Sequence, residues 1–86
     1  MKIVKIGAMW CPACIIMNKF WKEIKEEFNS FEFIDYDIDM DEDKIDKYNP
    51  GDTLPVIIMI NNDKEIKRLV GERKKEEVVS FLTGED

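Results

Sequence analysis

The feature that most constrains this chain is a pair of cysteines, Cys11 and Cys14, between a short strand pattern and a long helical pattern. Residues 2–6 are rich in β-branched side chains and are followed by Gly7, which is typical of a strand that ends there. If a helix begins at Pro12, Cys11 lies at its N-cap and Cys14 lies one turn along the same face. The two sulfurs could then form a disulfide. The helix start would favour the thiolate of Cys11, which makes Cys11 the expected nucleophile.

The rest of the chain alternates helix and strand patterns. Residues 12–28 carry apolar side chains at every third or fourth position, as an amphipathic helix does, and the bulky Phe20 and Trp21 are expected in the core. Residues 31–38 alternate apolar with acidic residues, as a half-buried strand does. We expect a short helix over 41–48 capped by Asp41 or a neighbour, strands over 56–60 and 64–70 joined by a turn at 61–63, and a helix over 72–82. This order predicts an α/β fold with a parallel crossover, in one domain over residues 1–86.

Charge and hydropathy exclude several classes of function. The net charge of −6 argues against nucleic acid as a partner, because nucleic-acid binding requires clustered Lys and Arg. The sequence contains no apolar run near the ~20 residues that cross a bilayer, and no cleavable signal pattern. We therefore expect no membrane association, and a cytoplasmic monomer whose thiols are kept reduced.

Metal sites are poorly supported. A closed structural zinc site takes four Cys or His ligands, whereas this chain has two Cys and no His. An inert cysteine pair, or a zinc site shared between chains, remains as an alternative. The acidic run Asp37-x-Asp39-x-Asp41 resembles the start of a calcium loop, but it has Glu42 in place of the required Gly and Tyr48 in place of the closing Glu. We expect no metal and no tightly bound cofactor.

The stretch Trp10-Cys11-Pro12-Ala13-Cys14 resembles the active site of the thioredoxin superfamily, and the similarity extends over nearly the whole chain. The resemblance implies the minimal thioredoxin fold, β-α-β-α-β-β-α, with a four-stranded mixed sheet and helices on both faces. It implies thiol–disulfide exchange through Cys11 and Cys14. It also implies a cis peptide bond before Pro55. The residues alone would not predict one, because X-Pro bonds are cis only about 5–6% of the time, and the alternative is a trans proline at the first position of a strand. The implied substrate-contact residues are Trp10, Pro12, Ala13, Leu54 and Pro55, with the Leu54 backbone pairing to an extended segment.

The expected function is a protein disulfide reductase, recycled by a thioredoxin reductase-like enzyme or by glutathione. One alternative is a glutathione-dependent glutaredoxin, which the small size and Thr53-Leu54-Pro55 suggest. Against it, only Gly71 stands where glutaredoxins usually have Gly-Gly followed by Asp. The other alternative is a binding module that holds an extended peptide and leaves its cysteines idle.

Lys5 departs most from the family pattern, because thioredoxins usually have a buried acid six residues before the first active-site Cys. Two interpretations follow from the residue type. If Lys5 stays charged and points toward the sulfurs, it favours a thiolate and makes the protein more oxidising. If it reaches solvent at a strand edge, its head is hydrated and it does not affect the chemistry.

Overall fold

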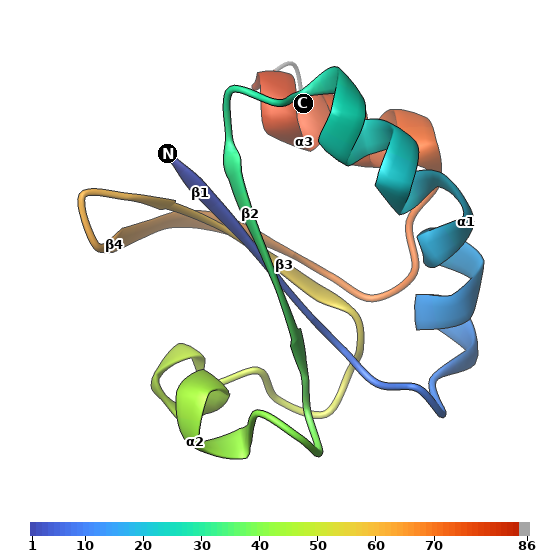
Figure 1. Cartoon of the computed structure of the whole chain (residues 1–86), viewed down its shortest axis with the longest axis vertical. Coiled ribbons are helices and arrows are strands. Elements are labelled where there is room, and N and C mark those ends of the chain that lie inside the picture. Colours follow the sequence, from blue (N-terminus) through green and yellow to red (C-terminus); the bar gives the residue numbers. More distant parts are fainter. Residues whose placement is uncertain (85–86) are drawn as a thin grey trace.

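A four-stranded mixed sheet with the strand order β2-β1-β3-β4 forms the centre of the protein (Figure 1). The computed structural model describes residues 1–84. The elements, in chain order, are β1 (Lys2–Gly7), α1 (Pro12–Glu27), β2 (Glu32–Asp37), α2 (Glu42–Ile45), the 3-10 turn η1 (Asp46–Tyr48), β3 (Val56–Asn61), β4 (Lys64–Val70) and α3 (Lys75–Thr83). The predicted α/β class and order of elements are therefore confirmed.

The strand β1 lies in the middle of the sheet. It pairs in parallel with β2, with Lys5 opposite Asp35, and antiparallel with β3, with Lys5 opposite Ile57. Because the first two strands are parallel, the chain must cross over between them, and α1 makes that crossover. Residues at the carboxyl ends of β1 and β2 are thereby brought to the same edge of the sheet.

Helices cover both faces of the sheet, with α1 and α3 on one side and α2 on the other (Figure 1). Successive side chains of a strand point to opposite faces, so Ile3 packs with α1 and α3 whereas Val4 packs with α2. Trp21 belongs to the α1 and α3 side. It is 3% exposed and meets the Phe33 ring edge-to-face at 5.6 Å between centroids. The expected core roles of Trp21 and of the half-buried Phe20 are confirmed.

Two predicted helices differ from the structure. The helix expected over 72–82 begins only at Lys75, because the Glu77 carboxylate accepts a hydrogen bond from the Lys74 N–H at 3.0 Å and caps the helix there. The helix expected over 41–48 is one α-helical turn followed by the 3-10 turn η1. Within residues 1–84, no helix has the length and apolar composition that crossing a membrane requires.

Acidic side chains after β2 serve the local backbone. Asp41 occupies the N-cap position of α2, as predicted, but its carboxylate makes no capping hydrogen bond and instead accepts one from the Asp37 N–H at 2.9 Å. The Asp37 carboxylate in turn accepts the N–H groups of Asp39, at 2.8 Å, and Met40, at 3.2 Å. These bonds close a tight turn at the end of β2, which is a structural use for part of the acidic run.

The core assignment can be tested with two isoleucines. Ile58 on β3 is fully buried, whereas Ile66 on β4 is 50% exposed. We expect Ile58→Ala to lower the free energy of unfolding by about 2–5 kcal/mol, since it leaves a cavity in the α2-side core. The matched control Ile66→Ala should cost less than about 1 kcal/mol. Urea unfolding measures both, and equal losses would contradict the assigned sheet register.

Candidate active site

The first residues of α1 build the site around the sulfur of Cys11. Cys11 is the N-cap, with φ −87° and ψ 114°, and its Sγ accepts a hydrogen bond from the Cys14 N–H at 3.2 Å. Pro12 occupies the start of the helix, where a missing N–H costs nothing. The predicted helix start is confirmed. Because one of the unpaired N–H groups of the first turn is directed at Cys11, negative charge on this sulfur is favoured.

The two cysteines have different surroundings. Both are free thiols; Cys11 is 5% exposed and Cys14 is 2% exposed. Cys14 lies directly over the end of β1, where a Cβ at Gly7 would come within 3.2 Å of its Sγ. From the sequence, Gly7 was expected only to end a strand. The close approach of α1 to this position, which a glycine permits, was not predicted.

Burial controls the protonation of Cys14. Burial first, and the interaction with the Cys11 side chain second, together raise the pKa of the Cys14 thiol to about 11. The Ala8 backbone and the Lys5 charge act in the opposite direction. Cys14 therefore remains a protonated thiol at neutral pH as long as Cys11 is not bonded to another sulfur.

The loop before β3 lies across the site from the helix start. The Leu54–Pro55 peptide bond is cis, and the Leu54 carbonyl oxygen is 3.8 Å from Cys11 Sγ, within range of a weak S–H hydrogen bond. Pro55 is buried, and its carbonyl accepts a hydrogen bond from the Gly71 N–H at 2.9 Å. Two segments that are far apart in sequence thus meet at Cys11.

The remaining predicted contact residues form the rim of the site. Trp10 is 64% exposed, Pro12 is exposed, and Ala13 is half-buried against the α2-side core. The Trp10 indole N–H donates a hydrogen bond to the Asp39 carboxylate at 2.6 Å, which ties the loop after β1 to the loop after β2. Sequence reasoning missed Asp39 as a partner, although the parallel crossover places these two loops side by side.

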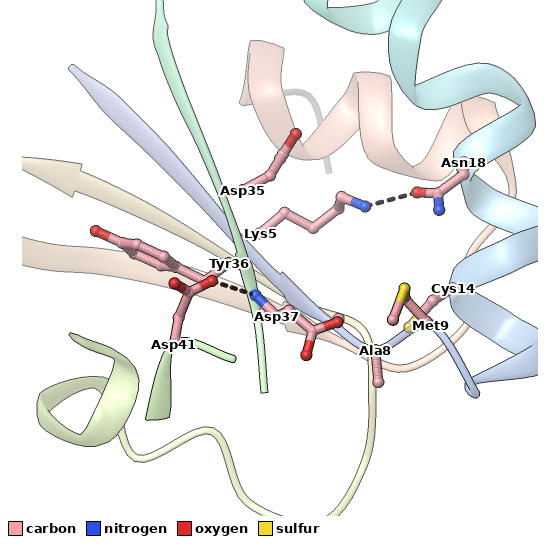
Figure 2. Close-up of a pocket in the computed structure, with 10 residues that line it drawn as sticks. Lys5, Ala8, Met9, Cys14, Asn18, Asp35, Tyr36, Asp37 and Asp41 are labelled. Carbon is pink, nitrogen blue, oxygen red and sulfur yellow. Dashed lines mark hydrogen bonds between the residues drawn. The ribbon is translucent and has the colours of Figure 1, made fainter. Parts of the chain in front are cut away.

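Lys5 points beneath α1 and not into solvent. It is 7% exposed, and its ammonium donates a hydrogen bond to the Asn18 side-chain oxygen at 2.7 Å (Figure 2). The same nitrogen is 5.4 Å from the centroid of the Trp21 ring. The interpretation of Lys5 as a hydrated lysine at a strand edge is wrong, because β1 is the central strand and α1 covers this face. No role was expected for Asn18 from the sequence, and Asp35 was expected only among the acidic residues on the solvated face of a strand.

Metal-binding groupings are missing from the described part of the chain: in residues 1–84 no three His, Cys, Asp or Glu side chains are gathered to hold an ion. A nucleophilic sulfur at a helix start with a second thiol one turn behind it is an arrangement suited to exchange with a disulfide.

The sequence is similar to those of several known thioredoxins. The chain is 27% identical to thioredoxin H2 of Arabidopsis thaliana over 74 residues, which covers 86% of this chain and 55% of that protein. It is 29% identical to a thioredoxin of Mycoplasma genitalium over 80 residues, covering 93% and 78%. The chain thus spans little more than half the length of the Arabidopsis relative, and 63% of an H-type thioredoxin of Fagopyrum esculentum.

Solved structures agree with these relatives. Fasciola hepatica thioredoxin matches with a TM-score of 0.86 at 22% identity, over 99% of this chain and 80% of that chain. The reduced thioredoxin pre-protein of Schistosoma mansoni matches with a TM-score of 0.84 at 26% identity, over 96% and 76%. The family model described as Thioredoxin matches residues 1–84. This chain, which has the minimal thioredoxin fold, therefore belongs to the thioredoxin family.

Proposed function

We propose that this protein is a thiol–disulfide oxidoreductase that works mainly as a protein disulfide reductase. The observation that carries the proposal is the position of Cys11 at the N-cap of α1, with its sulfur bonded to the Cys14 N–H and the Cys14 side chain buried behind it. Family membership supports the same class of reaction. We also propose that the protein is a monomer in the cytoplasm, where thiols are kept reduced.

The proposed reaction has two exchange steps. The Cys11 thiolate attacks one sulfur of a substrate disulfide, forms a mixed disulfide, and releases the other substrate sulfur as a thiolate. Cys14 then attacks the Cys11 sulfur, the bond between Cys11 and the substrate breaks, and the substrate leaves reduced. The protein is left with a Cys11–Cys14 disulfide and has lost two electrons. A reductase, or glutathione, returns it to the dithiol.

The geometry around Cys11 supports the proposed substrate-contact surface. The exposed Trp10 and Pro12 lie on the helix side, and the Leu54–Pro55 segment lies opposite, with Ala13 packed beneath. An extended substrate segment that passes alongside Leu54 would bring its disulfide to Cys11. Main-chain pairing at this place requires no particular substrate sequence, which suits a reductase of many proteins.

The two cysteines should behave differently when each is replaced. We expect Cys14→Ser to attack substrates through Cys11 and to accumulate as a mixed disulfide, because no second thiol remains to resolve it. We expect Cys11→Ser to trap nothing, since Cys14 is buried and remains a thiol at neutral pH. Mass spectrometry after incubation with a disulfide-containing protein measures both. Equal trapping by the two variants would contradict the assignment of Cys11 as nucleophile.

Alkylation distinguishes a working dithiol from idle cysteines in a peptide-binding module. At pH 7, iodoacetamide should modify Cys11 much faster than Cys14. Because burial raises the pKa of Cys14 to about 11, its reactivity should rise only as the pH approaches that value. Labelling followed by peptide mass spectrometry gives the two rates separately. Equal rates for the two cysteines across this pH range would contradict the different surroundings assigned to them and would favour idle cysteines.

Recycling separates the thioredoxin function from the glutaredoxin alternative. The oxidised protein should be reduced by NADPH together with a thioredoxin reductase faster than by reduced glutathione, because Gly71-Glu72 replaces the Gly-Gly-Asp pattern that glutaredoxins use to hold glutathione. NADPH consumption and the free-thiol content measure the two routes. Faster turnover with glutathione would favour the glutaredoxin alternative.

A further inference from the structure

Lys5 is a buried cation with an uncharged partner. Buried charges in proteins are ordinarily paired with an opposite charge, because an isolated charge loses much of its hydration. The Lys5 ammonium has three N–H donors, and it gives one to the neutral side chain of Asn18 at 2.7 Å. Among residues 1–84, no carboxylate lies within salt-bridge distance of it. Its position therefore lacks a direct counterion.

The acidic residue next to Lys5 in the sheet is committed elsewhere. Asp35 is the register partner of Lys5 on β2. One of its carboxylate oxygens accepts the Trp21 indole N–H at 3.0 Å, and the other accepts the Lys25 ammonium at 2.9 Å. Asp35 still opposes the effect of burial, which lowers the pKa of Lys5. It does so across a distance, without a hydrogen bond to Lys5.

The second thiol opens onto the same cavity as Lys5. A cavity of about 250 Å³ is bounded by β1, the end of β2 and the first turns of α1, and Lys5, Cys14 and Asn18 all line it (Figure 2). Cys14 and Asn18 are four residues apart on α1, so they share one face of the helix. Asn18 thus holds the ammonium beneath the helix face that carries Cys14.

Other charged groups around the cavity are acidic or distant. Asp35 and Asp37 line it from β2, and Asp41 lines it from the segment before α2. Asp37 and Asp41 are engaged in the backbone hydrogen bonds of the turn after β2. Lys25, on α1, is paired with Asp35. Lys5 is therefore the cation that remains to balance an anion formed at Cys14.

We propose that Lys5, held by Asn18, is the cation that stabilises the Cys14 thiolate when Cys14 attacks the mixed disulfide. This inference rests on the proposed function. In the dithiol, Cys11 helps to keep Cys14 protonated. Once the Cys11 sulfur is bonded to the substrate, it can no longer carry charge. Cys11 then no longer favours the protonated form of Cys14, and the Lys5 charge favours the Cys14 thiolate unopposed by Cys11.

The step balances with water as the proton carrier. The Cys14 thiol gives its proton to water in the cavity, and the thiolate electron pair forms the Cys14–Cys11 bond. The bond between Cys11 and the substrate sulfur breaks, and the substrate leaves as a thiolate that takes a proton from water. Cys14 and Cys11 become the oxidised pair and the substrate sulfur is reduced. Lys5 acts on Cys14 and does not contact the substrate, so it is a positioning residue.

A stopped-flow reaction with equimolar 5,5′-dithiobis(2-nitrobenzoate) measures the two steps separately. Formation of the mixed disulfide releases one coloured thiolate, and attack by Cys14 releases the second. Lys5→Met should leave the first release unchanged and slow the second at neutral pH, roughly tenfold for each unit by which the pKa of Cys14 rises. The pH profile of the second release should move to higher pH. Lys5→Arg, which keeps the charge, should retain most of the rate.

Two further variants give the test its controls. Lys19→Met removes an exposed lysine of α1 that does not line the cavity, and it should alter neither release. Asn18→Asp keeps Lys5 but gives the ammonium a carboxylate partner, so the second release should slow while circular dichroism shows a folded protein. If Lys5→Met does not fold, an unchanged second release in Asn18→Asp still overturns the role of Lys5.

The outcomes separate the two proposals. An unchanged second release in Lys5→Met, or in Asn18→Asp if the first variant is unfolded, would overturn the role of Lys5 and leave the reductase function standing. The role of Lys5 would also be overturned if Lys5→Arg slowed the second release as much as Lys5→Met does, because the loss of rate would then not come from the loss of charge. Failure of the wild-type protein to give the first release would instead overturn the proposed function.

Discussion

The hydrogen bond from the Cys14 N–H to the Cys11 sulfur determines where α1 begins, and the site depends on that start. It places Cys11 beside the Leu54 carbonyl and leaves Cys14 buried over the end of β1. The close approach at Gly7 leaves little room for any larger residue there. Two chemically identical thiols thereby acquire different surroundings, and an ordered two-step exchange needs that difference.

The buried Lys5 ammonium and the polar side chains of Asn18 and Asp35 set the charge on the α1 side of the sheet, near Cys14. Burying the Lys5 ammonium in a central strand is unfavourable unless something stabilises it. Asn18 supplies a hydrogen bond, and the face of Trp21 lies 5.4 Å from the ammonium nitrogen, close enough for a cation–π interaction. Asp35 supplies a negative charge at a distance. The Lys5 ammonium and Cys14 line the same cavity, which is the geometry that the proposed role of Lys5 requires.

Local patterns predicted most of the fold, and tertiary contacts account for what they missed. The strand before Cys11, the helix from Pro12 and the alternation in β2 all depend on neighbours in sequence. The neighbours of Lys5 in space do not depend on local sequence. The β1–β2 register brings Asp35 beside Lys5, and the docking of α1 brings Asn18 above it. Likewise, the late start of α3 depends on capping by Glu77, which hydrophobic periodicity does not encode.

The central claim is that Cys11 and Cys14 cycle together between dithiol and disulfide. Equilibration in dithiothreitol buffers of graded potential, followed by alkylation and intact-mass measurement, tests it most directly. We predict one two-electron transition within each chain, with the ratio of disulfide to dithiol changing tenfold for about every 30 mV. Thiols that stay reduced across the whole range, or that oxidise only to disulfides between chains, would contradict it.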